Sequence, residues 1–182
     1  LMMAAKPVLP TTAAIAQQLY PDAQIRAESF AETRLPGGFF DVTVGNVPFG
    51  DVRLHDPQHN PAGYALHNHF ILKALQLTRP GGLVAVLTSH YTLDSHDAAH
   101  RRDMHHLADL VGAIRLPTGA HKTAAGTEAV TDLLILRRRP PGDTPGDDDW
   151  VFTDPLTLPG PGSAVETLLM NRYLATNRAM VL

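Results

Sequence analysis

Two short apolar runs constrain the fold of this chain more than any other feature of its sequence. Residues Leu83–Leu87 and Leu133–Leu136 consist only of Leu, Val, Ile and Ala. A strand of this kind has no polar face to turn to water, which is typical of strands buried in a parallel sheet. The segment Leu66–Leu77 instead places apolar residues at helical spacing. Strands that alternate with helices predict an α/β fold, a mostly parallel sheet with helices on both faces.

Shorter patterns extend this alternation along the chain. Two Thr residues that can cap a helix, followed by Ala13–Tyr20 and Pro21, predict a short helix. Asp94 is expected to cap another helix that runs to about Leu107. Further strands are predicted over residues 23–28, 39–44, 110–116 and 131–136. A polar loop over residues 46–63 follows the strand at 39–44, and loops of such length are commonly functional.

The composition changes after residue 139, which suggests a boundary. Residues 140–149 are mostly Pro, Gly and Asp, a composition that buries too little apolar surface to fold alone. Ala164–Ala175 then has apolar residues at roughly helical spacing. We therefore expect one domain over 1–139, a linker or exposed loop over 140–163, and a C-terminal helical segment over 164–182 that leads to a further domain.

Composition excludes several classes of function. Of the 182 residues, 44% are hydrophobic and 18% charged, as in globular proteins. The apolar runs are far shorter than the roughly 20 residues needed to cross a bilayer. No membrane span and no secretory signal are therefore expected, and the cytoplasm is the predicted location. The absence of cysteine excludes disulfides, thiolate zinc sites and cysteine nucleophiles.

The charge balance sets limits on how the chain can hold nucleic acid. A net charge of −3 is not the basic balance that independent nucleic-acid binders usually show. Two local basic clusters occur, Arg101-Arg102 and Arg137-Arg138-Arg139. Short runs of this kind are more often a solvated helix face or strand end than a phosphate track. Any contacts with DNA must therefore be local or supplied by another part of a larger assembly.

The segment Asn46-Val47-Pro48-Phe49 carries the clearest chemical signal. It follows the strand at 39–44, and open α/β sheets bind ligands beyond the carboxyl ends of their strands. The Asn46 oxygen can accept a hydrogen bond from an exocyclic amine, a neighbouring main-chain carbonyl can accept another, and Phe49 can stack on a planar base. On the tetrapeptide alone, an ordinary Asn-x-Pro turn after a buried strand is the favoured interpretation, because Asn and Pro are common turn formers.

The wider sequence favours the chemical interpretation. The tetrapeptide resembles the Asn-Pro-Pro-aromatic motif of amino-methyltransferases, with Val47 in place of the first proline. The chain also resembles, from Thr11 through Arg139, the methylase region of a bacterial family in which an N6-adenine DNA methyltransferase is joined to a DEAD-like helicase. The matching segments are Leu19–Ala23, Gly45–Gly50, Leu77–Leu83, Leu110–Pro117 and Gly126–Asp132, with Asn171–Tyr173 and Met180–Leu182 beyond them.

The resemblance implies a Rossmann-like S-adenosylmethionine-dependent methyltransferase fold and a specific reaction. A methyl group would pass from S-adenosylmethionine to the N6 atom of an adenine flipped out of DNA. Asn46, Pro48 and Phe49 would be the catalytic residues, with Val47 and Gly50 beside the base. His121 and Lys122, at the tip of the loop 118–128, would also contact the substrate. Partners would be DNA and a helicase domain in the same polypeptide.

The cofactor side of such a site is poorly represented. Phe30, with Ser29, occupies a place where these enzymes bind the adenine of the cofactor, although a Phe that closes the core would have the same position. No Gly-x-Gly loop precedes Asn46, and Pro7–Pro10 stands where an acidic ligand of the ribose is expected. The domain is therefore predicted to lack its N-terminal cofactor-binding strand and loop, which another chain would supply.

Other interpretations remain open on the sequence. A catalytically inactive nucleic-acid or protein interaction module could keep the sheet and lose the cofactor. Methylation of a protein glutamine or of RNA would use the same motif. Ten histidines, among them His67 with His69 and His96 with His100, suggest a metal site. Zinc catalysis needs a third protein ligand and often a general base, and no His-Glu-x-x-His pattern occurs, so no metal is expected.

Overall fold

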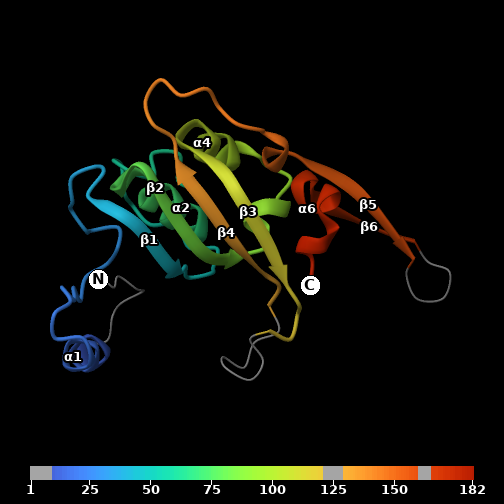
Figure 1. The fold of residues 1–182 in the computed structure, drawn as a ribbon. Helices are drawn as coiled ribbons and strands as arrows, with labels where there is room; N and C mark the ends of the chain where they lie inside the picture. The colour runs from blue at the N-terminus through green and yellow to red at the C-terminus, as the bar shows by residue number, and fades with distance from the viewer. Residues whose placement is uncertain (1–9, 121–128, 160–164) are drawn as a thin grey trace.

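A four-stranded mixed sheet forms the centre of the computed structural model, which describes residues 10–120, 129–159 and 165–182. The spatial order is β1 (Phe40–Asn46), β2 (Thr78–Ser89), β4 (Thr131–Arg138) and β3 (Ala108–Leu116). β1 and β2 are parallel, and β4 is antiparallel to both β2 and β3. Three of the four strands therefore run in one direction, with the antiparallel β4 inserted between two of them (Figure 1).

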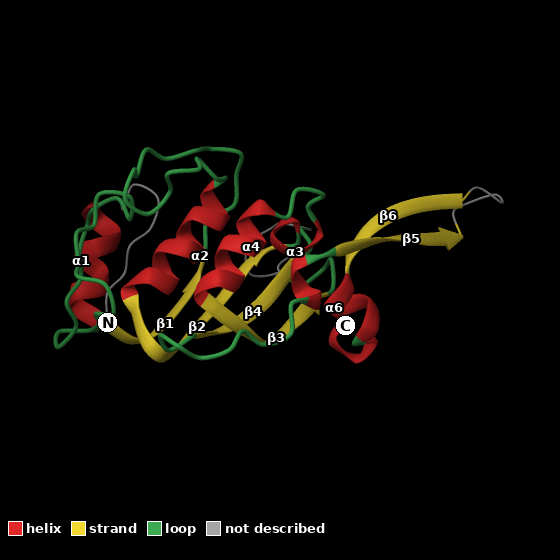
Figure 2. Ribbon diagram, turned by 90° about the horizontal axis from the view of Figure 1, so that it is seen from above, coloured by secondary structure: helices red, strands yellow, loops and turns green. Residues whose placement is uncertain are grey.

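One face of the sheet is covered by helices α2 (Leu66–Leu77) and α4 (Ala99–Leu107), which Figure 2 shows on the same side. Alternate residues of β2 and β4 point into this layer and are fully buried. The core they form with the helices includes Leu66, Ile71, Leu75, Val84, Val86, Met104, Leu134 and Leu136. At about 25 cal/mol per Å² of apolar surface removed from water, this layer is the main source of stability.

The opposite face of the sheet is open at β1 and β2. Val42 and Val44 of β1 are 51% and 74% exposed, and Leu83 of β2 lies beside Val42 with an exposed side chain. At β3 the C-terminal segment reaches this face, because a Cβ atom on Gly112 would lie 3.6 Å from the Tyr173 hydroxyl. The sequence predicts helices on both faces, and among the described residues the two faces are covered to different extents. The apolar runs do not distinguish a covered face from an open one, because both faces carry aliphatic residues.

Most elements expected from the sequence are present. Helix α1 (Pro10–Leu19) matches the expected N-terminal helix, and the four central strands match those expected from 39–44, 83–87, 110–116 and 131–136. The strand expected over 23–28 is wrong, since that segment is an irregular loop. A strand needs a neighbour to satisfy its backbone groups, and these residues pair with no strand of the sheet.

The cap predicted at Asp94 is also wrong. Asp94 ends the short helix α3 (Tyr91–Asp94), and α4 begins five residues later at Ala99. The Asp97 carboxylate accepts the Ala99 amide at 2.9 Å and takes the role expected of Asp94. Asp94 instead accepts the Asn171 amide at 2.9 Å and pairs with Arg115 at 2.7 Å, so it links the C-terminal segment to the sheet.

The C-terminal part differs most from the expectation. The helix predicted over 164–175 is absent, because β6 (Val165–Asn171) pairs with β5 (Thr153–Pro159) in an antiparallel hairpin. This ladder satisfies backbone groups that a helix would otherwise pair. The hairpin projects from the body of the molecule (Figures 1 and 2). Only α6 (Arg172–Thr176) and the 3-10 turn Arg178–Met180 are helical beyond it.

In the linker or exposed loop expected over 140–163, residues 141–148 are exposed, whereas the residues that follow them are anchored. A 3-10 turn at Asp149–Val151 buries Trp150, which is 1% exposed. The Trp150 ring meets His105 of α4 edge-on, at 5.9 Å between centroids. The side chain of Asn171 donates to the Trp150 carbonyl at 2.8 Å.

None of the described helices is long and apolar enough to span a membrane.

A close approach of β1 and β2 generates a prediction about Gly82. A Cβ atom built on Gly82 would lie 2.4 Å from the Asp41 carbonyl oxygen and 2.7 Å from Thr78 Cγ2, whereas one on Gly45 would meet nothing within 4 Å. Gly82→Ala should therefore reduce the free energy of unfolding by about 1–3 kcal/mol. Gly45→Ala, the matched control in the same sheet, should be as stable as the wild type. Urea denaturation measures both, and equal stability of the two variants would contradict this packing.

Candidate functional site

The carboxyl ends of three strands meet at one edge of the sheet. Asn46, the last residue of β1, lies opposite Leu87 of β2. β4 runs the other way, so its first residue, Thr131, lies opposite both Ser89 at the end of β2 and Leu116 at the end of β3. Residues at the start of β4 and at the ends of the other three strands therefore share the edge at which α/β sheets bind ligands.

The motif residues lie at this edge with different exposures. Asn46 is exposed, and none of the described residues forms a hydrogen bond with its amide. Val47 is buried, and its N–H donates to the Leu87 carbonyl at 3.0 Å. Pro48 and Phe49 are half-buried, and Phe49 packs against the core. One backbone bond thus fixes the turn, while the Asn46 amide remains available to a ligand.

A buried ionic cluster holds the loop that follows the motif. The Asp56 carboxylate, 1% exposed, accepts Lys73 Nζ at 2.8 Å and lies 3.1 Å from His69 Nε2, both on α2. Lys73 Nζ also donates to the Ala31 carbonyl at 3.2 Å and lies 5.2 Å from the centre of the Phe30 ring. One carboxylate therefore ties the motif loop to α2 and, through Lys73, to the segment that carries Phe30.

The ionisation of this cluster follows from its contacts. Burial raises the pKa of Asp56, but hydrogen bonds from Lys73 and His69 outweigh it and hold the pKa below its ordinary value. Burial lowers the pKa of Lys73 and of His69, and the Asp56 carboxylate opposes both shifts. Two of these groups were not singled out from the sequence. A Lys in the middle of an apolar helix face is the signal that could have indicated them.

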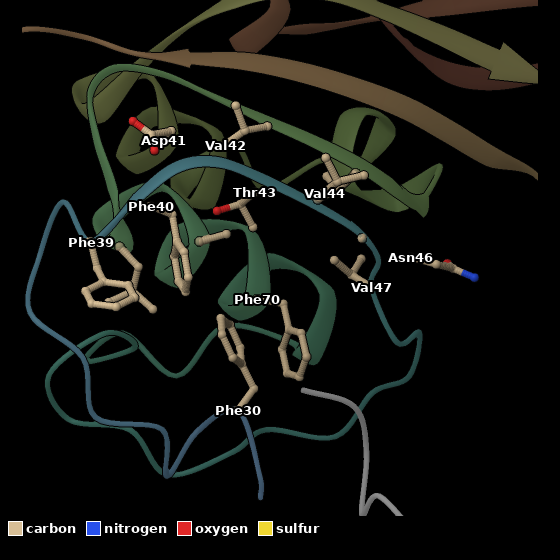
Figure 3. Close-up of a pocket in the computed structure, with 14 residues that line it drawn as sticks. Phe30, Phe39, Phe40, Asp41, Val42, Thr43, Val44, Asn46, Val47 and Phe70 are labelled. Carbon is tan, nitrogen blue, oxygen red and sulfur yellow. The ribbon is translucent and has the colours of Figure 1, made fainter. Parts of the chain in front are cut away.

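A cavity of about 470 Å³ runs along the outer side of β1 (Figure 3). Its wall includes Phe30 and Phe70, whose ring centroids are 4.7 Å apart, together with Phe40, Asn46 and Val47. Figure 3 shows the Asn46 side chain pointing away from the aromatic rings. The cavity thus brings Phe30 near the strand that ends in Asn46, but the Phe30 and Asn46 side chains do not face each other (Figure 3).

The remaining site residues are dispersed. Ser29 does not line the cavity, and its carbonyl accepts the amides of Glu32 and Thr33 in a turn. Gly50 follows Phe49 with a φ of 151°, a conformation that L side chains rarely adopt. His121 and Lys122 lie outside the described residues, so their predicted contact with substrate stays a prediction. Of the residues predicted on the cofactor side, Phe30 alone contributes to the cavity.

The cavity suits only part of S-adenosylmethionine. Its aromatic rings could cover an adenine, and its volume is in the range of small-molecule sites. Of its polar side chains, Thr43 and Asp41 already have partners, since the Thr43 hydroxyl lies 2.8 Å from that of Thr78 and Asp41 pairs with Arg79 at 2.6 Å, whereas the Asn46 amide points away from the rings (Figure 3). No other described residue of its wall offers a carboxylate to ribose hydroxyls. The described residues therefore do not hold the ribose and methionine parts of the cofactor.

The histidines expected not to bind metal have structural roles. His69 contacts Asp56, and His100 Nε2 lies 2.9 Å from the Thr92 carbonyl. His96 is exposed whereas His100 is buried, so the pair does not converge despite its helical spacing. Among the described residues no group of three His, Asp or Glu side chains could hold a metal ion.

The basic clusters are also structural. Arg101 is fully buried and donates to the carbonyls of Val151 at 2.7 Å and Ser95 at 2.8 Å. Arg139 pairs with Asp109 at 2.6 Å, and Arg138 donates to the Leu107 carbonyl at 2.7 Å. The interpretation of these clusters as a solvated helix face or strand end is therefore wrong for Arg101. These three guanidinium groups bind protein atoms rather than forming a track for phosphates.

Comparisons with known proteins place this geometry in a known fold. No family model matches the chain. The M protein of the type I restriction enzyme EcoKI shares 19% identity with a TM-score of 0.58, over 78% of this chain and 31% of that one. A candidate class I S-adenosylmethionine-dependent methyltransferase from Listeria monocytogenes gives 19% identity and 0.58, over 75% and 43%. The chain has part of the Rossmann-like S-adenosylmethionine-dependent methyltransferase fold.

A longer relative appears among curated proteins. The protein named defense against restriction protein B, from Escherichia phage P1, is 30% identical over 146 residues. This match covers 76% of the chain but 6% of the phage protein. The chain thus corresponds to a small part of that protein, and to less than half of the solved methyltransferase-fold chains it resembles.

The buried ionic cluster predicts a large stability effect. Asp56→Asn leaves the Lys73 ammonium buried without its counter-ion, which should cost about 3–5 kcal/mol of unfolding free energy. Asp41→Asn is the matched control, because it breaks the exposed pair with Arg79 and should cost less than about 1 kcal/mol. Replacing both partners, Asp56→Leu with Lys73→Met, should recover much of the loss. Chemical denaturation of the four proteins tests this, and equal effects of the two Asn variants would contradict it.

His100 predicts a pH effect in the acid range. Burial lowers the pKa of His100 from 6.5 to about 4. Between pH 6.5 and pH 4 this histidine is therefore protonated in the unfolded chain and neutral in the native chain. The associated stability is present above pH 6.5 and lost as the pH falls toward 4, a change of about 3 kcal/mol. His100→Gln should flatten this part of the pH–stability profile, while the exposed His96→Gln should not. A profile with the same slope in all three proteins would refute the assignment.

Proposed function

We propose that this chain is the target-base part of an S-adenosylmethionine-dependent DNA adenine N6-methyltransferase that acts on a flipped adenine. The observation that carries the proposal is the turn Asn46–Phe49, held at the carboxyl end of β1 with a free amide at its start. Support comes from the fold, which the chain shares in part with the M protein of a type I restriction enzyme.

The turn presents acceptors suited to an exocyclic amine. The Asn46 side-chain oxygen can accept one hydrogen of the adenine amino group, and the Val47 carbonyl can accept the other. None of the described residues donates to that carbonyl. The hydrogen bond that fixes Val47 is made by its N–H instead. With both hydrogens directed to acceptors, the nitrogen lone pair is turned toward the methyl donor. Phe49, half-buried at the same edge, would stack on the base.

The proposal includes a second polypeptide segment for the cofactor. The described cavity fits an adenine but not the rest of S-adenosylmethionine. Among the described strands β1 pairs with β2 alone, so its other edge lacks a described partner strand, and β1 exposes Val42 and Val44. Free edges and exposed apolar side chains of this kind are normally covered in native proteins. A cofactor-binding half, in the same longer polypeptide or in another chain, would complete the sheet there.

A helicase domain in the same polypeptide is a further part of the proposal. The phage relative is many times longer than the matched region, which leaves room for additional domains in related proteins. Arg101, Arg138 and Arg139 of the basic clusters bind protein atoms, so these clusters leave few guanidinium groups for a long DNA track. Strand separation by an attached domain would supply the unpaired adenine that Asn46 needs, because a stacked base cannot reach the turn.

A second candidate function follows from the incomplete cofactor site. A nucleic-acid or protein interaction module that has lost catalysis would keep the sheet and the turn without the ribose and methionine contacts. Calorimetric titration of S-adenosylmethionine into the chain separates the two. Binding in the micromolar range would support the methyltransferase, whereas the absence of heat, also after a cofactor-binding half is added, would support the interaction module.

Asn46 provides the direct test of the chemistry. In the presence of the cofactor-binding half, Asn46→Ala should reduce methyl transfer to adenine-containing DNA by about 100-fold or more, because an acceptor that orients the reacting amine is lost. The residue is exposed at a strand end, so thermal unfolding should be unchanged. Asn177→Ala, an exposed asparagine in the C-terminal segment, is the control and should transfer methyl groups at the wild-type rate. Wild-type transfer by Asn46→Ala would exclude the proposed role.

A further inference from the structure

An exposed Tyr91 ring and the half-buried His90 ring beside it follow β2 at the same edge of the sheet. The rings of His90 and Tyr91 lie 4.0 Å apart between centroids with an interplanar angle of 36°. Tyr91 is 60% exposed, although the two residues that follow it, Thr92 and Leu93, are fully buried. The chain thus directs a large aromatic ring outward from a point at which the backbone is closely packed.

The backbone beneath these rings is held by several hydrogen bonds. The His90 N–H donates to the Val130 carbonyl at 3.3 Å, which ties the pair to the segment before β4. The amides of Leu93 and Asp94 donate to the His90 carbonyl at 3.0 and 2.9 Å. The hydroxyls of Thr88 and Thr92 lie 2.8 Å apart in the interior. Tyr91 is therefore mounted on a fixed turn rather than on a loop that adapts to each contact.

The position of this turn relates it to the proposed base site. Asn46 lies opposite Leu87 in the β1–β2 pairing, and Val47 donates to the Leu87 carbonyl. Tyr91 comes four residues after Leu87, beyond the end of β2. The Asn46 turn and the Tyr91 turn are thus the continuations of two neighbouring parallel strands, and both leave the sheet at its carboxyl edge.

We propose that Tyr91, backed by His90, is a stacking platform for a base that neighbours the target adenine in the bound strand. This inference rests on the proposed function and adds a second contact to it. An exposed ring that is held in place by a second ring beside it offers the flat apolar surface that nucleobases prefer. Stacking also suits this surface because the described basic clusters, apart from the exposed residues Arg102 and Arg137, are occupied by protein acceptors.

Binding of a short adenine-containing single-stranded DNA tests the platform. Fluorescence anisotropy of the labelled strand should show that Tyr91→Ala weakens binding by about 5- to 150-fold, the loss expected from one base–aromatic stack. Tyr91→Phe keeps the ring and should keep the wild-type Kd. Tyr20→Ala is the matched control, because Tyr20 is also exposed, at 52%, but follows α1 rather than a strand of the sheet. It should bind like the wild type.

The outcomes distinguish this inference from the proposed function. Equal binding by Tyr91→Ala and wild type would overturn the platform and leave the role of Asn46 untouched. A loss of binding that also appears in Tyr91→Phe would overturn stacking as the cause. A wild-type chain that does not bind the strand at all would overturn both the platform and DNA as the substrate. A rise in salt should weaken wild-type binding only slightly, since stacking releases few counterions.

Discussion

The buried carboxylate of Asp56 is the interaction on which the arrangement of the candidate site depends. It lies in the loop that follows the Asn46 turn and pairs with Lys73, which in turn contacts the Ala31 carbonyl and the Phe30 ring. Two segments that are separate in the sequence are thereby fixed to one helix. Because an ammonium group buried without a counter-ion is costly, the loop cannot leave α2 without a large loss of stability.

The sheet determines where the candidate site lies, but its strands do not determine what the site binds. Three strands that run the same way bring their carboxyl ends to one edge, and the antiparallel β4 returns the chain to that edge at Thr131. Arg115 at the end of β3 pairs with Asp132 at 2.9 Å and with Asp94 at 2.7 Å. Arg115 and Asp132 lie within the segments that resemble the methylase family, and these ion pairs give both residues a structural role. They keep the edge rigid around whatever it binds.

Patterns of apolar residues predicted the central elements well. The runs in β2 and β4 and the helical spacing of α2 correspond to elements that bury continuous surface, so the sequence carries their periodicity directly. The motif turn could be located in the same way, since it follows β1. What could not be predicted depends on partners distant in the chain. Residues 23–28 alternate like a strand but have no strand beside them in the described sheet.

Charged residues were the hardest to interpret from the sequence. Arg101 lies in a polar helix and resembles a surface residue, yet it is buried because carbonyls of Val151 and Ser95 lie within reach. The spacing of apolar residues in the segment 164–175 is compatible with a helix or with a strand. Residues of this segment form a strand because β5 is present as a pairing partner. In both cases the deciding contact comes from residues that no local pattern includes.

The burial of Trp150 has a practical consequence. It is the single tryptophan of the chain, and it lies between α4 and the base of the β5–β6 hairpin, where His105 meets its ring. Its emission therefore senses whether the hairpin segment is docked on the α/β layer. If that segment detaches before the sheet melts, the fluorescence change would precede the loss of circular dichroism. The chain thus carries an intrinsic optical reporter for the boundary between its two parts.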